Sequence, residues 1–419
     1  MTFARGLASV LKKTPNDIVL LSSLRTPITR SYKGSLKDAY PEQLLASVLS
    51  ATLAANPNLP PSAVEDVAVG VVLSELGGSK AARMALNHAG YDTASTSLYT
   101  VNRACGSSLQ GLAVVAGQIR SGMVGVGIAA GMESMTRNYG SRAIPQDLWP
   151  VLKASEVDDV KDCIMPMGTT SEIVAAKGDV SRADQDAFAV ESHARASRAQ
   201  TSGAFDAEIV PVTTPFQAVD KQGNKVGEEE IITVTRDDGI RHDATLEKMA
   251  RLKPVFAADG RSTAGNSSQV SDGAAATLLT TRARAEELGL AGSIMGKFVS
   301  AVTAGCAPRE MGIGPAVAIP RLLERHGLEV GDVGRWEINE AFASQAIYCV
   351  RELGLEDAWV KGRVNPDGGA IALGHPLGAT GARMVSTLMH GMGRDGSEVG
   401  VVSMCVGTGM GMAGLFVKE

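Results

Sequence analysis

Cys105 lies at a switch from a strand pattern to a helix pattern, and this switch constrains the fold more than any other feature of the chain. Residues 98–101 are rich in apolar and β-prone side chains. Apolar residues then recur at helical spacing, at Leu109, Leu112, Ala113, Ala116 and Ile119. Because the unpaired N–H groups of a helix N-terminus favour a thiolate, this position predicts a nucleophilic cysteine with a lowered pKa. The alternative is a small residue of the hydrophobic core.

Three runs near the C-terminus carry the polar groups that a nucleophilic cysteine needs. Asn339 follows a short strand pattern and precedes a helix pattern, and His375 ends a glycine-rich run. Cys405 and Gly407 follow a further strand pattern. Loops at the ends of regular elements are the usual place for catalytic side chains. Taken singly, Asn339 is equally a helix cap and His375 a structural histidine, but the set favours an active site.

These loops together resemble the thiolase family. The nucleophile loop, Asn339-Glu-Ala-Phe, Gly374-His-Pro and Cys405-Val-Gly stand in the order typical of that family. Further runs that resemble family signatures lie at 131–135, 165–168 and 263–274. Several motifs in order are far more specific than any one of them. From about residue 16 onward the chain is therefore identified as a member of the family.

The resemblance implies an α/β protein with the thiolase fold, in which two similar αβαβα halves carry an inserted loop domain. Alternating strand and helix patterns at both ends, separated by a more polar middle, agree with an α/β class. The expected domains are an N-terminal half at 1–134 plus 271–291, a loop domain at 135–270 and a C-terminal half at 292–419. Within the loop domain, Ser181 is expected to cap a helix and residues 217–241 to form a surface loop or hairpin.

The resemblance also implies a role for each site residue. Cys105 would form an acyl-enzyme with the 3-keto carbon of a 3-ketoacyl-CoA, and His375 would activate it and polarise the thioester oxygen. Asn339 would act through a bound water in the same oxyanion hole, and Cys405 would exchange the C2 proton of the acetyl group. Backbone N–H groups of Cys105 and Gly407 would form a second oxyanion hole, where glycine permits close approach.

Coenzyme A is expected as a substrate, together with acyl-CoA, with no permanently bound cofactor and no metal. By residue match to the family, Met167, Ala264 and Ser268 would border the pantetheine arm, and Phe342 would help to wall the pocket. The phosphates need cations, and those nearby in sequence are Lys221, Lys225, Arg236, Arg241, Arg251 and Lys253. Because solvated surface charge also explains such residues, the sequence leaves open which of them bind.

Local details favour one thiolase type and reveal two departures from the family. Pro166-Met-Gly resembles the degradative type, which shortens 3-ketoacyl-CoA in fatty-acid β-oxidation. The alternative is the biosynthetic type, which condenses two acetyl-CoA and more often carries His before Met-Gly. Ser108 stands where the family usually has Gly, and Ile173 stands where it usually has Asn. We expect Ser108 beside the acyl chain, where it would narrow the pocket.

Composition agrees with a large soluble enzyme. The 419 residues exceed the roughly 250–300 that one core usually supports. A net charge of −5 without a basic, aromatic patch argues against nucleic acid, and no stretch is apolar enough to span a membrane. Five cysteines, an odd number, indicate a reducing compartment, and no residue set has zinc-site spacing. We expect Cys163, Cys306 and Cys349 to be packing residues.

The N-terminal run at 5–13 resembles a peroxisomal targeting helix whose key residues have drifted, or else an amphipathic leader without an address. We therefore expect a peroxisomal location, with a cytoplasmic one as the alternative. By resemblance the protein is expected to be a homodimer or homotetramer. A binding protein on this scaffold, or a purely structural protein, would be expected to lack at least one of Cys105, Asn339, His375 and Cys405.

Overall fold

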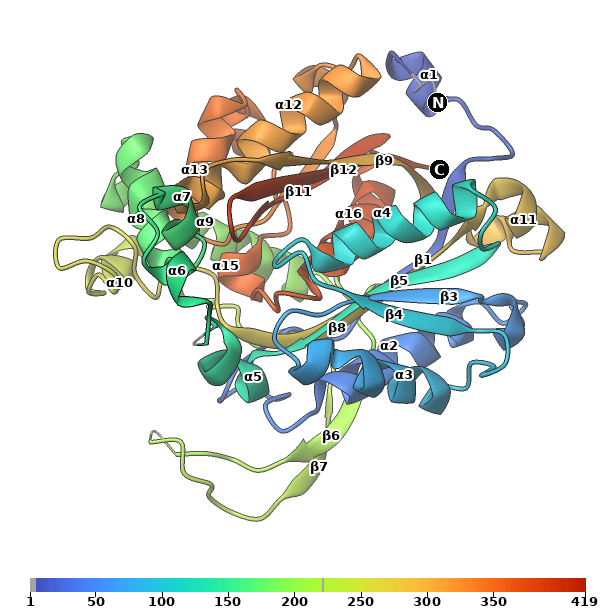
Figure 1. The fold of residues 1–419 in the computed structure, drawn as a ribbon, viewed down its shortest axis with the longest axis horizontal. Helices are drawn as coiled ribbons and strands as arrows, with labels where there is room; N and C mark the ends of the chain where they lie inside the picture. The colour runs from blue at the N-terminus through green and yellow to red at the C-terminus, as the bar shows by residue number, and fades with distance from the viewer. Residues whose placement is uncertain (1–4, 146, 221) are drawn as a thin grey trace.

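Strands and helices alternate at both ends of the chain, and the middle is mostly helical or irregular (Figure 1). The computed structural model describes residues 5–145, 147–220 and 222–419. The strands are β1 (Ile18–Arg25), β2 (Thr29–Arg30), β3 (Asp66–Gly70), β4 (Ser97–Val101), β5 (Val126–Ser134), β6 (Val212–Phe216), β7 (Glu230–Val234), β8 (Ser271–Thr281), β9 (Gly296–Gly305), β10 (Arg335–Ile338), β11 (Val399–Val406) and β12 (Met410–Lys418).

The α-helices are α1 (Leu7–Leu11), α2 (Pro41–Ala55), α3 (Ser79–His88), α4 (Ser107–Arg120), α5 (Met135–Arg142), α6 (Pro150–Lys153), α7 (Asp158–Asp162), α8 (Met167–Lys177), α9 (Arg182–Thr201), α10 (Leu246–Ala250), α11 (Arg282–Glu287), α12 (Gly314–His326), α13 (Ala343–Glu352), α14 (Glu356–Val360), α15 (Ala370–Leu373) and α16 (Thr380–Asp395). Short 3-10 turns lie at Pro61–Ala63, Glu75–Gly78, Ala291–Ser293, Pro308–Ile313 and Val330–Asp332.

One long mixed sheet organises the protein. Its strand order is β10-β11-β12-β9-β1-β8-β5-β3-β4, and β2 pairs with β8. The sheet is folded into two arms, one made of β4, β3, β5, β8 and β1 and the other of β9, β12, β11 and β10. The two arms enclose α4 and α16, while α12 and α13 cover one outer face and α2 and α3 the other (Figure 1). The order of layers is therefore helix, sheet, helix, sheet, helix, which confirms the predicted α/β class.

The pairing pattern of the sheet repeats. β3 and β5 are parallel, β5 and β8 antiparallel, and β8 and β1 antiparallel. In the other arm β10 and β11 are parallel, β11 and β12 antiparallel, and β12 and β9 antiparallel. Helix α4 precedes β5 as α16 precedes β11, and the two helices pack together. The loops that carry Cys105 and His375 thus stand at equivalent places in the two arms.

The strand and the helix that were predicted on either side of Cys105 are both present. β4 ends at Val101, and α4 begins at Ser107 with Leu109, Leu112, Ala116 and Ile119 buried against α16 and both arms of the sheet. Two boundaries differ from expectation. The glycine-rich run before His375 contains the short helix α15, and Cys405 lies inside β11 instead of after it.

The middle of the chain begins with helical segments that cover one end of the sheet. Ser181 caps α9 and forms a reciprocal capping box with Asp184, as predicted. β6 and β7 pair in a hairpin that projects from the body, and its turn and return strand lie within the predicted 217–241 segment (Figure 1).

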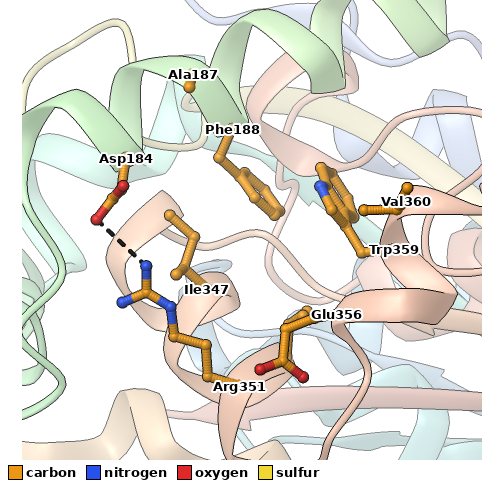
Figure 2. Close-up of a pocket in the computed structure, with 9 residues that line it drawn as sticks. Asp184, Ala187, Phe188, Ile347, Arg351, Glu356, Trp359 and Val360 are labelled. Carbon is orange, nitrogen blue, oxygen red and sulfur yellow. Dashed lines mark hydrogen bonds and ion pairs between the residues drawn. The ribbon is translucent and has the colours of Figure 1, made fainter.

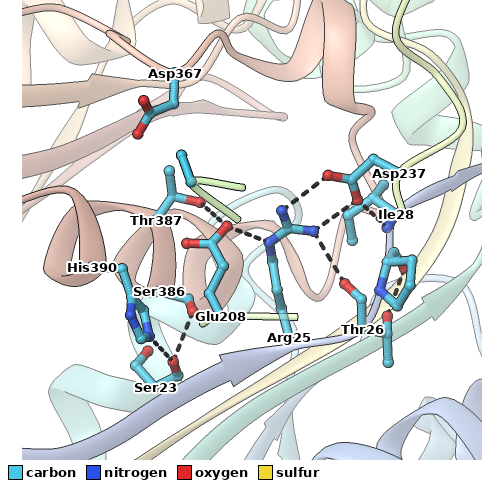
Figure 3. A network of polar contacts seen from close by, with 12 residues as sticks. Ser23, Arg25, Thr26, Ile28, Glu208, Asp237, Asp367, Ser386, Thr387 and His390 are labelled. Atoms are coloured by element: carbon cyan, nitrogen blue, oxygen red, sulfur yellow. Dashed lines mark hydrogen bonds and ion pairs between the residues drawn. The ribbon is translucent and has the colours of Figure 1, made fainter. Parts of the chain in front are cut away.

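A buried ionic network fixes this middle segment to the sheet and to α16 (Figure 3). Arg25, at the end of β1, donates to Glu208 at 2.6 Å and to Asp237 at 2.7 Å and 2.9 Å. Thr387 of α16 donates to Glu208 at 3.1 Å. Because Arg25 and Glu208 have no exposed surface, removal of either partner would leave a buried unpaired charge.

The N-terminal run forms α1, whose Val10 is buried in a cluster with residues of α12 and β12. The N–H of Gly6 donates to the carbonyl of His326 at 2.6 Å. None of the described helices is long and apolar enough to cross a membrane.

Candidate active site

A strained turn presents Cys105 at the start of α4. Ala104 has φ of 41°, a conformation that few residues with a side chain adopt. Its N–H donates to Asn102 Oδ1 at 2.9 Å. Ser107 Oγ accepts from the N–H of Arg103 at 2.9 Å and donates to the carbonyl of Ala104 at 2.6 Å. These local bonds fix the direction of the Cys105 side chain.

The side chain of Cys105 is partly exposed. Burial raises the pKa of Cys105 to about 11, and the charge of Glu133 acts in the same direction. The backbone N–H groups of Gly407 and of Cys105 itself point at the sulfur and act against this, but they do not offset burial. The expectation of a lowered pKa is therefore wrong, because desolvation of the thiolate outweighs the helix N-terminus.

His375 is held in one tautomer by its neighbours. Its Nδ1 lies 2.7 Å from Thr380 Oγ1, and that hydroxyl donates to the carbonyl of Pro376 at 3.1 Å. We assign the proton to Nδ1, because the Thr380 hydroxyl can then accept it while donating to Pro376, and Nε2 can accept from Asn339 Nδ2. Burial, together with nearby Arg383, lowers the pKa of His375 to about 3. The imidazole is thus a neutral base.

Asn339 lies beside this base. Its Nδ2 is 3.4 Å from His375 Nε2, and its backbone N–H extends the β10–β11 pairing by donating to Ser403 at 2.9 Å. Its Oδ1 is buried and has no hydrogen-bond partner among the described residues. A buried acceptor of this kind calls for a water or a substrate group.

Cys405 and Gly407 lie next to the Cys105 turn. Burial, and then the neighbouring Cys105, raise the pKa of Cys405. A Cβ at Gly407 would be 3.6 Å from Ala104 Cβ and 4.0 Å from Met167 Sδ. These are ordinary contacts, so no protein atom requires glycine at this position.

The loop that follows His375 packs against the backbone of β3 and β5, at a position where each strand carries a glycine. A Cβ at Gly131 of β5 would be 2.3 Å from the carbonyl oxygen of Gly378, and one at Gly70 of β3 would be 2.5 Å from the same atom. Glu133, two residues beyond Gly131, accepts from the N–H of Gly378 at 3.0 Å. Main chain therefore packs on main chain between the two halves of the site.

Two buried acids that sequence reasoning missed hold these loops. Besides Gly378, Glu133 accepts from the N–H groups of Val72 and Leu73. Glu340, next to Asn339, accepts from Ser192 at 2.6 Å and from Asn365 at 2.8 Å. The one available signal was their place inside the family-like runs at 131–135 and 339–342.

The predicted coenzyme A residues fall into two adjoining groups. Ala264 and Ser268 line a cavity of about 350 Å³ together with Phe256. Met167 and Phe342 pack beside Cys405. Phe256 meets Phe342 edge to face, with ring centroids 6.1 Å apart, and so joins the cavity to the cysteines.

Two cations that line this cavity were not among those suggested by nearness in sequence. Arg30 and Lys33, which follow β1 in the chain, line it. Burial, and then the nearby charge of Arg30, lower the pKa of Arg241, so Arg241 lies close to this rim. None of the other described cations proposed from sequence lines the cavity: Lys225, Arg236, Arg251 and Lys253. Lys221 lies outside the described residues.

Other expected positions need correction. Ser108 is fully buried and its Oγ accepts from the N–H of Ala382 at 2.9 Å, so it faces α16 and not an acyl pocket. Cys163 is exposed and is not a packing residue, Cys306 is partly exposed, and Cys349 is buried. Ile173 is partly buried in α8.

A second cavity of about 290 Å³ lies between α9, α13 and α14 (Figure 2). Phe188 stacks on Trp359 with ring centroids 4.2 Å apart, and Arg351 pairs with Asp184 at its edge. It contains none of the predicted site residues. In the part of the chain that the structure describes, no group of three or more His, Cys, Asp or Glu could hold a metal ion.

Comparison with known proteins agrees with this geometry. The chain matches the thiolase N-terminal domain over residues 18–283 and the thiolase C-terminal domain over residues 293–418. It is 49% identical over 401 residues to the peroxisomal 3-ketoacyl-CoA thiolase of Homo sapiens, covering 96% of this chain and 90% of that protein.

Two solved structures are similar over nearly the full length. The dimeric peroxisomal thiolase of Saccharomyces cerevisiae has a TM-score of 0.86 and 39% identity, covering 98% of this chain and all of that one. Human mitochondrial 3-ketoacyl-CoA thiolase in complex with CoA has a TM-score of 0.81 and 31% identity, covering 97% and 98%. The chain has the thiolase fold and belongs to the thiolase family.

Proposed function

We propose that the protein is a 3-ketoacyl-CoA thiolase, an acyltransferase that cleaves 3-ketoacyl-CoA with CoA in fatty-acid β-oxidation. The observation that carries this is that Cys105 and Cys405 are close neighbours, while a neutral His375 contacts Asn339, whose backbone N–H donates to Ser403 on the strand that carries Cys405. The names of the similar proteins support the same activity and favour it over the biosynthetic alternative.

The first half-reaction makes the acyl-enzyme. The thiol proton of Cys105 moves to His375 Nε2 as the sulfur bonds to C3 of the substrate. The C2–C3 bond then breaks, its electron pair forms the enolate of acetyl-CoA, and Cys405 gives a proton to C2. N–H groups of Cys105 and Gly407 stabilise the oxygen on C3, because they already point at the sulfur that attacks it.

The second oxygen that becomes negative is the thioester oxygen of the enolate. His375, now carrying a proton at Nε2, stabilises it, and Asn339 assists through a water held by its amide group. In the second half-reaction the thiol of CoA gives its proton to Cys405 and attacks the acyl carbon. Cys105 leaves as a thiolate and recovers its proton from His375, so the enzyme returns to its starting state.

Coenzyme A occupies the cavity that contains Ala264 and Ser268, with its thiol end toward Met167 and Phe342. Arg30 and Lys33 stand at this cavity and Arg241 lies near its rim, so these three are our candidates for the phosphates. A guanidinium pairs well with phosphate oxygens, and two adjacent cations that repel each other gain most from an anion between them.

Domain limits, assembly and location complete the proposal. The halves are 1–134 plus 271–291 and 292–419, and the loop domain is 135–270. A homodimer is supported by the dimeric yeast relative, and a tetramer remains the alternative. A peroxisomal location is supported by the names of the relatives, with a drifted N-terminal signal as the means.

Substrate length tests the function. We expect thiolysis of a medium-chain 3-ketoacyl-CoA at a kcat/KM equal to or above that for acetoacetyl-CoA, because a degradative enzyme must accept more than a methyl group. The assay follows loss of the 3-ketoacyl-CoA absorbance in the presence of CoA. Activity on acetoacetyl-CoA alone would favour the biosynthetic type, and no thiolysis of either would refute the proposal.

A further inference from the structure

Helix α16, which follows the His375 loop, receives a cap from another helix. Its own N-cap residue, Ala379, has no side chain that can accept a hydrogen bond. The N–H of Ala382, in the first turn, instead donates to Ser108 Oγ of α4 at 2.9 Å. Such first-turn N–H groups have no partner within their own helix, so a side-chain acceptor stabilises the helix start.

The hydroxyl of Ser108 sits in a space made by glycines. A Cβ at Gly381 would be 3.0 Å from Ser108 Oγ, and one at Gly131 would be 2.9 Å from Ser108 Cβ. Ser108 itself has no exposed surface. The contact is therefore enclosed by backbone on several sides, and water cannot replace the hydroxyl without a shift of these chains.

This bond joins the two loops that carry the reacting groups. Ser108 follows Cys105 by one turn of α4, and Ala382 lies in the same turn of α16 as Thr380. Thr380 holds Nδ1 of His375. Any displacement of the first turn of α16 relative to α4 thus moves the base relative to the nucleophile.

We propose that Ser108 is a positioning residue whose trans-helix cap on α16 sets the geometry between Cys105 and His375. The role rests on the proposed thiolase function for its kinetic consequence, but the bond itself does not.

Ser108→Ala in the full-length protein tests the proposal. We expect kcat for thiolysis to fall roughly tenfold with KM for CoA unchanged, because small displacements of a positioned base cost rate and not binding. The rate of Cys105 alkylation by iodoacetamide at pH 7 should fall by a similar factor. Amide exchange of the peptide that contains Ala382 should become faster.

The control is Met392→Ala, which weakens the distal end of α16 in the same helix. It should lower the melting temperature without changing kcat or the alkylation rate at 25 °C. Ser108→Gly is the second variant if the alanine variant does not fold, and it should show the same losses. A folded variant that lacks the hydroxyl yet has the wild-type kcat and alkylation rate overturns the proposal. Wild-type protein without thiolase activity would refute the function instead, and the alkylation and exchange readouts would still decide the role of Ser108.

Discussion

Thr380 offers the sharpest test of how the site works, because its hydroxyl contacts Nδ1 of His375 and favours one tautomer of the ring. Thr380→Val keeps the shape of the side chain and removes the acceptor that lies 2.7 Å from Nδ1. Both groups are buried, so Nδ1–H would remain without a partner. A buried unpaired donor costs about 1–3 kcal/mol, which corresponds to a factor of about 5 to 150 in rate.

Steady-state thiolysis of acetoacetyl-CoA measures this loss, and we expect kcat to fall by about 10- to 100-fold with little change in KM. Thr380→Ser is the matched control, because it retains the hydroxyl and should keep most of the rate. The free energy of unfolding of the valine variant should fall by about 1–2 kcal/mol in urea titration. If the valine variant kept kcat within twofold of wild type, or if the serine variant lost as much as valine, the tautomer argument would be refuted.

Three further predictions concern the cysteines and the glycine beside them. Cys405→Ala should still transfer an acyl group from acyl-CoA to Cys105, which intact-mass measurement detects, but it should no longer exchange deuterium at C2 of the acetyl group. Equal loss of both reactions would contradict separate roles for the two cysteines. Gly407→Ala should have a melting temperature within about 2 °C of wild type, since the added Cβ makes only ordinary contacts. Its kcat should fall at least about tenfold, because the Cβ would stand where the substrate approaches the backbone. An unchanged kcat would mean that no substrate atom comes close to this position. Because the pKa of His375 is lowered to about 3, its base form persists as pH falls, so kcat/KM should stay level between about pH 5 and 7. Because the pKa of Cys105 is raised to about 11, the ultraviolet absorbance of its thiolate, measured against Cys105→Ser, should be almost absent at about pH 9, and a strong thiolate signal there would disprove the raised value.

The positions of the chemical groups could be predicted because short-range signals fix them. A strand pattern, a turn of small residues and a helical period are enough to place Cys105 at a helix start, and similar signals place Asn339 and His375 in loops. Their meeting could be inferred only from the family resemblance, since no local rule brings residue 105 next to residue 405.

Properties that depend on surroundings could not be predicted. The helix N-terminus suggested an acidic thiol, but the pKa of Cys105 is set mainly by burial, which arises from distant segments. Arg30 and Lys33 reach the cavity from a segment more than two hundred residues before Ala264, so nearness in sequence could not indicate them. Ser108 was expected at the substrate because it follows Cys105, yet Cys105 lies in the turn before α4 while Ser108 lies inside the helix, where its side chain meets α16.

The main-chain contact between Gly378 and the glycines at 70 and 131 has a consequence for altering this enzyme. Ordinary packed positions tolerate exchange when a neighbouring side chain is replaced by a smaller one, but here the nearest atoms belong to the backbone, which no substitution removes. Laboratory evolution should therefore find almost no accepted changes at these three glycines, whatever substrate is selected. Libraries intended to shift chain-length preference should therefore leave these three positions fixed.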